Sequence, residues 1–248
     1  MTGHNQPLVL LHGWGMHSGV WAAAATDLGS AGHVIAVDLP GYGGRASVSP
    51  YTLETLATTI AADLPARFDL CAWSLGGQLA LVMAQMMPER VRRLVLVGTN
   101  PCFTSRPDWQ CATAPAILTQ FAAQLSQHYE VTLKRFLALQ VHGDAAARQS
   151  LARLRALLFV RGRPDQAVLQ AGLAILLTAD LRPLVAGIAA PTLVIHGEYD
   201  QLVPVCAAQW LADNLPDGRL QVISSASHAP FLSHAHAFEA ALLAFLKW

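Results

Sequence analysis

The sequence is poor in charge. Only 13% of its 248 residues are Asp, Glu, Lys or Arg, about half of the usual quarter, whereas 53% are hydrophobic. A chain this apolar is not intrinsically disordered, and its length allows one large domain or two small ones, each with a buried core. Sixteen basic residues balance sixteen acidic ones, and the lack of a basic excess argues against nucleic acid as a partner.

Signals for export and for membrane insertion are also missing. Residues 1–26 carry no charged side chain, so they lack the positive start of a signal peptide. Residues 70–88 are equally free of charge, but Ser74, Gly76 and Gln78 interrupt them, which a membrane-spanning helix disfavours. We expect both segments to be buried in a cytoplasmic protein that contacts no membrane. No heptad pattern indicates an oligomer, so a monomer is expected.

Cysteine is scarce and shows no metal-binding pattern. The four cysteines, Cys71, Cys102, Cys111 and Cys206, include no CxxC pair. In a cytoplasmic chain this spacing predicts four free thiols. There is also no HExxH motif and no cluster of Cys and His, so neither a metal nor an organic cofactor is expected.

Short apolar runs bounded by turn residues alternate with helical patterns. Each run has the length and the continuous apolar character of a strand buried on both faces of a parallel sheet. The predicted strands are residues 8–12, 33–38, 69–73, 91–97, 192–197 and 220–224. The predicted helices between and after them are residues 21–28, 53–64, 75–87, 205–215 and 231–245. This alternation predicts an α/β fold with a mostly parallel, doubly wound sheet.

One long segment departs from the alternation. Residues 101–184 contain helical patterns at 116–125, 131–141, 145–160 and 166–177 but no convincing strand. We therefore expect a helical cap at 101–184, inserted into a core formed by residues 1–100 and 185–248.

The strongest chemical signal follows the third predicted strand. There Ala72-Trp73-Ser74-Leu75-Gly76-Gly77 resembles the G-x-S-x-G nucleophile elbow, whose small residues permit a strained turn that exposes the serine hydroxyl. Ala72 stands where the motif usually has glycine. A structural alternative is that Ser74 only caps an ordinary helix. Backbone N–H groups of Leu75 and of Trp14, in the glycine-rich turn after the first strand, are the candidate oxyanion hole.

Serine at neutral pH needs a base and a group that orients the base. His228 follows the sixth predicted strand, at the edge of the sheet where α/β sites form, whereas His234 and His236 are expected in the next helix. Glu198 and Asp200 both follow the fifth strand, and we favour Asp200. The order Ser74, Asp200, His228 is the chain order of an α/β-hydrolase triad.

These residues make the chain similar to the α/β-hydrolases with an inserted cap, over nearly its whole length. Five strings resemble, more narrowly, the BioH-like esterases of biotin synthesis. They are residues 10–15 (LLHGWG), 73–77 (WSLGG), 100–103 (NPCF), 135–140 (RFLALQ) and 227–231 (SHAPF). The string in the predicted cap is the most discriminating, because the others recur across α/β-hydrolases. Only seven residues precede the first predicted strand, so the usual leading antiparallel hairpin is expected to be missing or short.

The resemblance implies a serine carboxylesterase that hydrolyses the methyl ester of pimeloyl-acyl-carrier protein through an acyl-enzyme. It implies that Ser74 attacks, that His228 transfers protons, and that Asp200 holds the imidazole tautomer. The substrate contacts that it implies are Trp14, Ser74, Leu75, Phe136, Leu137, Ala138, Leu139, Gln140 and His228. A general short-chain esterase or thioesterase is the main alternative. A C–C bond hydrolase and a non-catalytic binding protein are weaker ones.

Charge is concentrated in the predicted cap. Residues 131–163 contain seven basic residues and one acid, Asp144, so this segment carries +6 and the rest of the chain −6. On a helix over 145–160, Leu151, Leu154 and Leu158 share one face and the arginines lie outside it. Acyl-carrier proteins are acidic, so these cations are candidates for docking one. The docking candidates are Lys134, Arg135, Arg148, Arg153 and Arg155. The alternative is a helix face that is simply solvated.

Overall fold

The computed structural model describes residues 6–30 and 32–247. Residues 1–5 lie outside this range. They belong to segment 1–26, in which no signal peptide is expected, and to the seven residues that precede the first predicted strand. The six strands that the structure describes form one sheet with the order β2-β1-β3-β4-β5-β6, and every neighbouring pair is parallel. They are β1 (Leu8–Leu11), β2 (Val34–Val37), β3 (Phe68–Trp73), β4 (Val91–Val97), β5 (Thr192–Gly197) and β6 (Gly218–Ile223). A doubly wound sheet was predicted, and the strand positions agree within two residues.

Burial along the strands follows their place in the sheet. Every residue of β1, β3 and β5 is buried, as an apolar run covered on both faces requires. The edge strand β6 instead alternates, with Arg219 and Gln221 exposed, because its outer side faces solvent.

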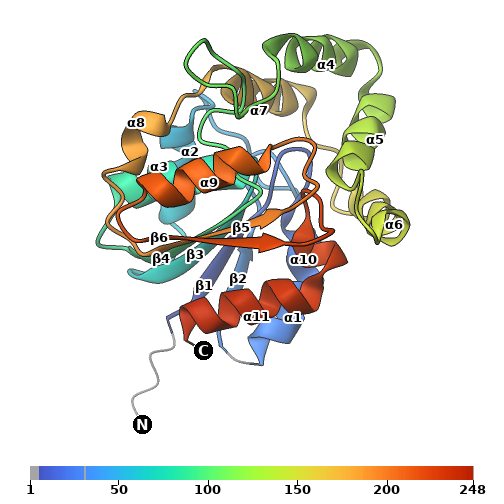
Figure 1. The fold of residues 1–248 in the computed structure, drawn as a ribbon. Coiled ribbons are helices and arrows are strands. Elements are labelled where there is room, and N and C mark those ends of the chain that lie inside the picture. The colour runs from blue at the N-terminus through green and yellow to red at the C-terminus, as the bar shows by residue number, and fades with distance from the viewer. Residues whose placement is uncertain (1–5, 31, 248) are drawn as a thin grey trace.

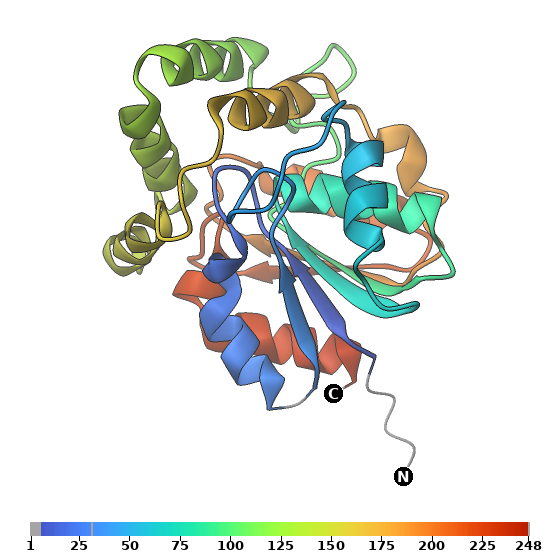
Figure 2. The same ribbon diagram turned by 180° about the vertical axis from the view of Figure 1, so that it is seen from behind.

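Helices cover both faces of the sheet (Figures 1 and 2). One face carries α1 (Ala22–Gly29) and α11 (Ala235–Leu246), and the other carries α2 (Leu53–Ala61), α3 (Leu75–Met86), α8 (Arg182–Val185) and α9 (Val205–Asn214). The 3₁₀ helix η1 (Ser18–Trp21) leads into α1, and α10 (Pro230–Ser233) precedes α11. The prediction of a single helix over 231–245 is therefore wrong. The chain breaks at His234, whose φ and ψ are −127° and 46°, so only His236 lies within α11.

A layer of helices lies beyond the carboxyl ends of the strands (Figure 1). It consists of α4 (Pro115–Gln127), α5 (Tyr129–Gln140), α6 (Ala147–Leu157) and α7 (Gln166–Thr178), all between β4 and β5. We call these four helices the cap helices. Loops that follow β1 reach them through side chains. The indole N–H of Trp14 donates to the Leu169 carbonyl at 2.9 Å, and a ring nitrogen of His17 lies 2.8 Å from the Leu157 carbonyl. The cap helices thus close over the strand ends.

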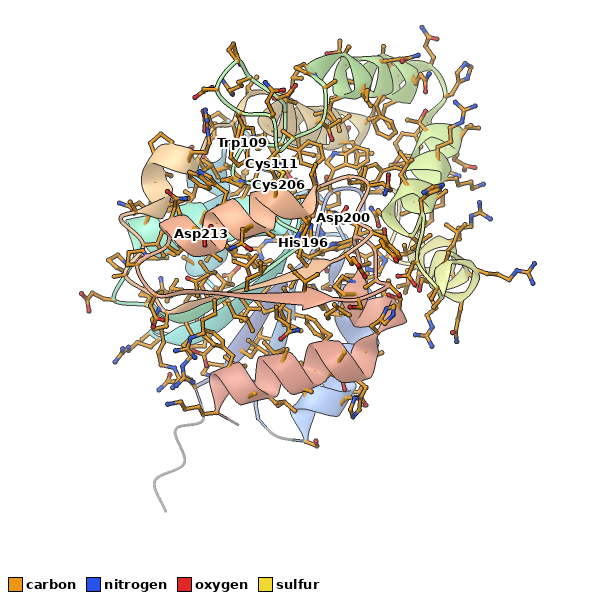
Figure 3. All side chains as sticks on the ribbon, viewed as in Figure 1. Trp109, Cys111, His196, Asp200, Cys206 and Asp213 are labelled. Carbon is orange, nitrogen blue, oxygen red and sulfur yellow. A yellow bond between two sulfur atoms is a disulfide. The ribbon has the colours of Figure 1, made fainter. Side chains whose placement is uncertain are left out.

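A disulfide also joins this region to the core. Cys111, in the loop between β4 and α4, is bonded to Cys206 at the start of α9, with the two Cα atoms 5.6 Å apart (Figure 3). Trp109 lies beside it, with its ring edge-on to Trp210 at 5.3 Å. Cys71 and Cys102 are free and buried. The prediction of four free thiols is therefore wrong for two of them. The partners are 95 residues apart, so only the folded chain brings them together.

No helix that the structure describes is both long and apolar enough to cross a bilayer.

Candidate active site

Ser74 occupies a strained turn between β3 and α3. Its φ of 58° and ψ of −117° lie outside the regions that L-residues ordinarily adopt. Small neighbours make this turn possible. A Cβ on Gly76 would lie 2.5 Å from the His12 carbonyl oxygen, and one on Gly13 would lie 3.2 Å from the Ser74 Cβ. Ala72, the departure from the elbow motif, is fully buried in β3 between Leu11 and Leu96, so the sheet accommodates its methyl group.

His228 and Asp200 form a buried hydrogen-bonded pair. Nδ1 of His228 lies 2.7 Å from Oδ2 of Asp200. A carboxylate only accepts, so Nδ1 carries the proton and Nε2 is left free as a base. Nε2 is buried and has no hydrogen-bond partner among the described residues. It is therefore not hydrogen-bonded to the Ser74 hydroxyl either. Trp73 places His228 next to the elbow, because its indole N–H donates to the His228 carbonyl at 2.9 Å.

Other groups hold the Asp200 carboxylate in place. Its Oδ1 accepts the backbone N–H groups of Leu202 and Val203, each at 2.9 Å. Burial of Asp200 opposes its ionisation, but the electrostatic attraction and hydrogen bond of the His228 ring, together with His196 and the Val203 N–H, outweigh it and lower the pKa of Asp200. Glu198, the other carboxylate considered, is exposed and accepts the Ser225 N–H instead. Asp200 is thus the acid that contacts His228.

Two more buried histidines, His12 and His196, lie at strand ends, and they differ in how they are bonded, because Nδ1 of His196 has no partner among the described residues. Both ring nitrogens of His12 are engaged, one with the Gly13 carbonyl and one as acceptor of the Leu39 N–H. Burial lowers the pKa of His12 to about 4. His196 lies beside Asp200 (Figure 3), with Nε2 at 2.9 Å from the Val203 carbonyl and at 3.5 Å from Oδ2 of Asp200. The sequence alone gave no sign that His196 approaches the acid.

Backbone donors are available next to Ser74. Leu75 is the first residue of α3, so its N–H has no carbonyl one turn earlier in the helix to bond. Within the described residues neither this N–H nor that of Trp14 donates to another group. The positive end of the α3 dipole lies at the same place. The two predicted oxyanion donors are therefore free to bind an anion.

The predicted substrate segment lies on α5, the cap helix that packs over Trp14. The Trp14 ring lies edge-on to the Phe136 ring, with the two ring centroids 4.9 Å apart. Phe136, Leu137 and Gln140 are buried, and the side-chain oxygen of Gln140 has no partner among the described residues. Leu139 is 42% exposed, so it lies on the outer face of α5, and Ala138 is half-buried.

The five predicted docking cations are all exposed, on two adjacent cap helices. Lys134 and Arg135 lie on α5, and Arg148, Arg153 and Arg155 lie on α6. Lys134 is 3.5 Å from Glu130, one helical turn away, and Arg153 donates to the Leu232 carbonyl. Arg135, Arg148 and Arg155 form no ion pair with any described residue. Of the three leucines predicted to share one face, Leu154 and Leu158 are buried and Leu151 is half-buried.

Known proteins resemble this chain in sequence over nearly its whole length. The model of the alpha/beta hydrolase family matches residues 8–241. A Nitrosomonas europaea protein named pimeloyl-[acyl-carrier protein] methyl ester esterase is 43% identical over 96% of this chain and 94% of its own. One of the same name from Chromobacterium violaceum is 41% identical, over 99% and 96%.

Solved structures show the same fold. An esterase from Exiguobacterium antarcticum superposes with a TM-score of 0.88 at 24% identity, over 98% of this chain and 92% of its own. The enol-lactonase of Burkholderia xenovorans superposes with a TM-score of 0.86, also at 24% identity, over 99% of this chain and 93% of its own. The predicted fold class is thus confirmed. With its parallel sheet, its strained serine turn and its relatives, the chain belongs to the alpha/beta hydrolase family.

Proposed function

We propose that this protein is a serine carboxylesterase that hydrolyses the methyl ester of pimeloyl-acyl-carrier protein in biotin synthesis. The observation that carries the proposal is the buried His228–Asp200 hydrogen bond of 2.7 Å beside the strained turn of Ser74. The names of relatives at 41–43% identity support the choice of substrate.

In this mechanism the chemistry runs through the free nitrogen of His228. Nε2 takes the proton of the Ser74 hydroxyl as its oxygen attacks the ester carbonyl, and the N–H groups of Trp14 and Leu75 stabilise the oxyanion. The protonated imidazole then donates its proton to the departing methoxide oxygen, so methanol leaves and the acyl group remains bonded to the Ser74 oxygen. Water, activated by the same nitrogen, releases the free carboxylate and restores Ser74. Asp200 keeps Nδ1 protonated throughout, so Nε2 always faces the reaction.

The elbow turn supplies part of the activation without further residues. Positive φ lifts the Ser74 side chain off the strand, and Ser74 is 7% exposed beneath the cap helices. A nucleophile shielded in this way acts in a medium of low dielectric constant, where oriented N–H groups stabilise charge more strongly than they do in water.

We also propose the division into a core (residues 1–100 and 185–248) and a cap (residues 101–184), with the cap as the binding region. Its cations Arg135, Arg148 and Arg155, which pair with no acid in the described part of the chain, are suited to an acidic carrier protein, and the segment 136–140 is suited to the acyl chain. A monomer in the cytoplasm, without metal, cofactor, nucleic acid or membrane, remains our prediction. The disulfide is uncommon for that compartment, so thiol alkylation in fresh lysate should establish its state in cells.

The decisive test is hydrolysis of purified pimeloyl-acyl-carrier protein methyl ester, followed by mass spectrometry, beside growth without biotin of cells that lack this esterase. We expect loss of the methyl group and restored growth. Hydrolysis of p-nitrophenyl acetate alone would favour the general esterase. A protein that no fluorophosphonate probe labels would be the non-catalytic binder.

A further inference from the structure

The loop that carries His228 is joined by three hydrogen bonds to the last residue of α5 and to the turn between α5 and α6. The His228 N–H donates to the Gln140 carbonyl at 3.0 Å, and the Ala145 N–H donates to the Ser225 carbonyl at 3.3 Å. The third bond uses a side chain, because the Ser227 N–H donates to Oδ2 of Asp144 at 3.1 Å. The base of the proposed triad therefore depends on the cap for its place.

Asp144 is the only acid in the basic segment 131–163, and it is buried. Its side chain is 2% exposed. Its Oδ1 accepts the Ala146 N–H at 2.7 Å just before α6 begins, while Oδ2 holds Ser227. The one basic side chain within 4.0 Å of it among the described residues is the half-buried His234, whose Nδ1 is 4.0 Å away. A carboxylate that loses water without a close ion pair is costly to bury.

We propose that Asp144 is a positioning residue that fixes the His228 loop to the start of α6. The proposal rests on the proposed triad. One oxygen of the Asp144 carboxylate accepts a backbone N–H of the turn before α6, and the other accepts the backbone N–H of Ser227, the residue before His228. The helix that it anchors carries Arg148, Arg153 and Arg155, so the docking surface and the catalytic loop share this anchor.

The backbone of the His228 loop explains why it needs an anchor. Ser225 has a φ of 61°, in the left-handed region that costs an L-residue free energy. Its carbonyl accepts the Ala145 N–H from the turn that Asp144 organises. Without the carboxylate, the Ser227 N–H loses its partner and the loop relaxes. A shift of about 1 Å in a catalytic group can lower a rate by about 10²-fold.

Asp165 provides a matched control. Its Oδ1 accepts the Ala167 N–H at 2.9 Å at the start of α7, the same local bond that Asp144 makes before α6. Asp165 is exposed and bonds no residue of the His228 loop among those described. Asp144→Ala and Asp165→Ala therefore both lose a helix-start bond, but only the first releases Ser227.

The test compares kcat and KM for p-nitrophenyl acetate in the two variants. We expect Asp144→Ala to lower kcat by about 10- to 100-fold with KM within about threefold, and Asp165→Ala to change neither by more than about twofold. Asp144→Asn keeps one oxygen acceptor and should recover part of kcat. A kcat of Asp144→Ala close to that of the wild type, or equal losses in both alanine variants, would overturn the proposal.

A second readout does not depend on activity. The Nδ1–H of His228, bonded to Asp200, should give a proton NMR signal far downfield. We expect Asp144→Ala and, less strongly, Asp144→Asn to shift or broaden this signal and Asp165→Ala to leave it unchanged. An unchanged signal in the Asp144 variants overturns the positioning role, even if the enzyme proved to have another substrate. An inactive wild-type protein with a responsive signal would instead refute only the proposed function.

Discussion

The sheet core and the cap helices use their residues in opposite ways. In the core, β1 and β3 expose no residue, and the Asp69 carboxylate is fully buried in an ion pair with Arg92. In the cap, α6 buries only Ser150 and Leu154 and turns its arginines to solvent. Burial from all sides fixes atoms, whereas exposed charge attracts partners over a distance. We therefore expect the core to carry the chemistry and the cap to select the partner, so changes in each should have different effects.

The largest effect is expected in the core, where Ser74→Ala removes the nucleophile. We expect kcat to fall on the order of 10⁶-fold for carrier-bound and small esters alike, as in other serine hydrolases. Labelling by a fluorophosphonate probe should be lost with it, while circular dichroism confirms the fold. Substantial residual turnover would remove Ser74 from its role.

Asp200→Asn comes next. The new amide can donate to Nδ1 of His228 and so favours the wrong imidazole tautomer, which should lower kcat by about 10⁴-fold. Glu198→Gln is the matched control, since Glu198 lies two residues away and its carboxylate accepts, among the described residues, only the Ser225 N–H. Its kcat should stay within about threefold of the wild type. Similar losses in both variants would contradict the assignment of the acid.

The bond between the two regions should affect stability rather than rate. Cys111→Ser with Cys206→Ser opens a loop of 95 residues, and we expect the free energy of unfolding to fall by about 2–4 kcal/mol. Urea titrations with and without dithiothreitol measure this. The wild type should respond to the reductant and the double variant should not. A wild type insensitive to reductant would show that the disulfide adds no stability.

The smallest effect is expected on the cap surface and should depend on the substrate. Arg135→Glu with Arg148→Glu should lower kcat/KM for the carrier-bound ester by about 10- to 100-fold through slower association, and leave p-nitrophenyl acetate unchanged. Added salt should weaken the wild type on the carrier-bound ester alone. The exposed core pair Arg67→Glu with Arg219→Glu controls for net charge. Equal losses on both substrates would contradict docking.

The sequence predicted the core well because each strand there is a continuous apolar run bounded by turn residues. The same local signals led to Ser74, Asp200 and His228, each next to the end of such a strand. What escaped prediction depends on contacts between distant segments. From the sequence, Asp144 is only the single acid in a basic segment. Its contact with Ser227 could not be predicted, because Ser227 is 83 residues further along the chain. The helix α8, only four residues long and starting next to a proline, carries too short a periodic pattern to detect.

The Cys111–Cys206 bond makes a covalent ring of everything between these residues. All four cap helices, Asp144 and Asp200 lie inside it. A protease that cuts the chain once between α6 and α7 would therefore release no fragment, and the two pieces would separate on a gel only after reduction. In the nicked protein, the piece that holds Ser74 and the arginines of α6 would remain attached through the disulfide to the piece that holds Asp200 and His228.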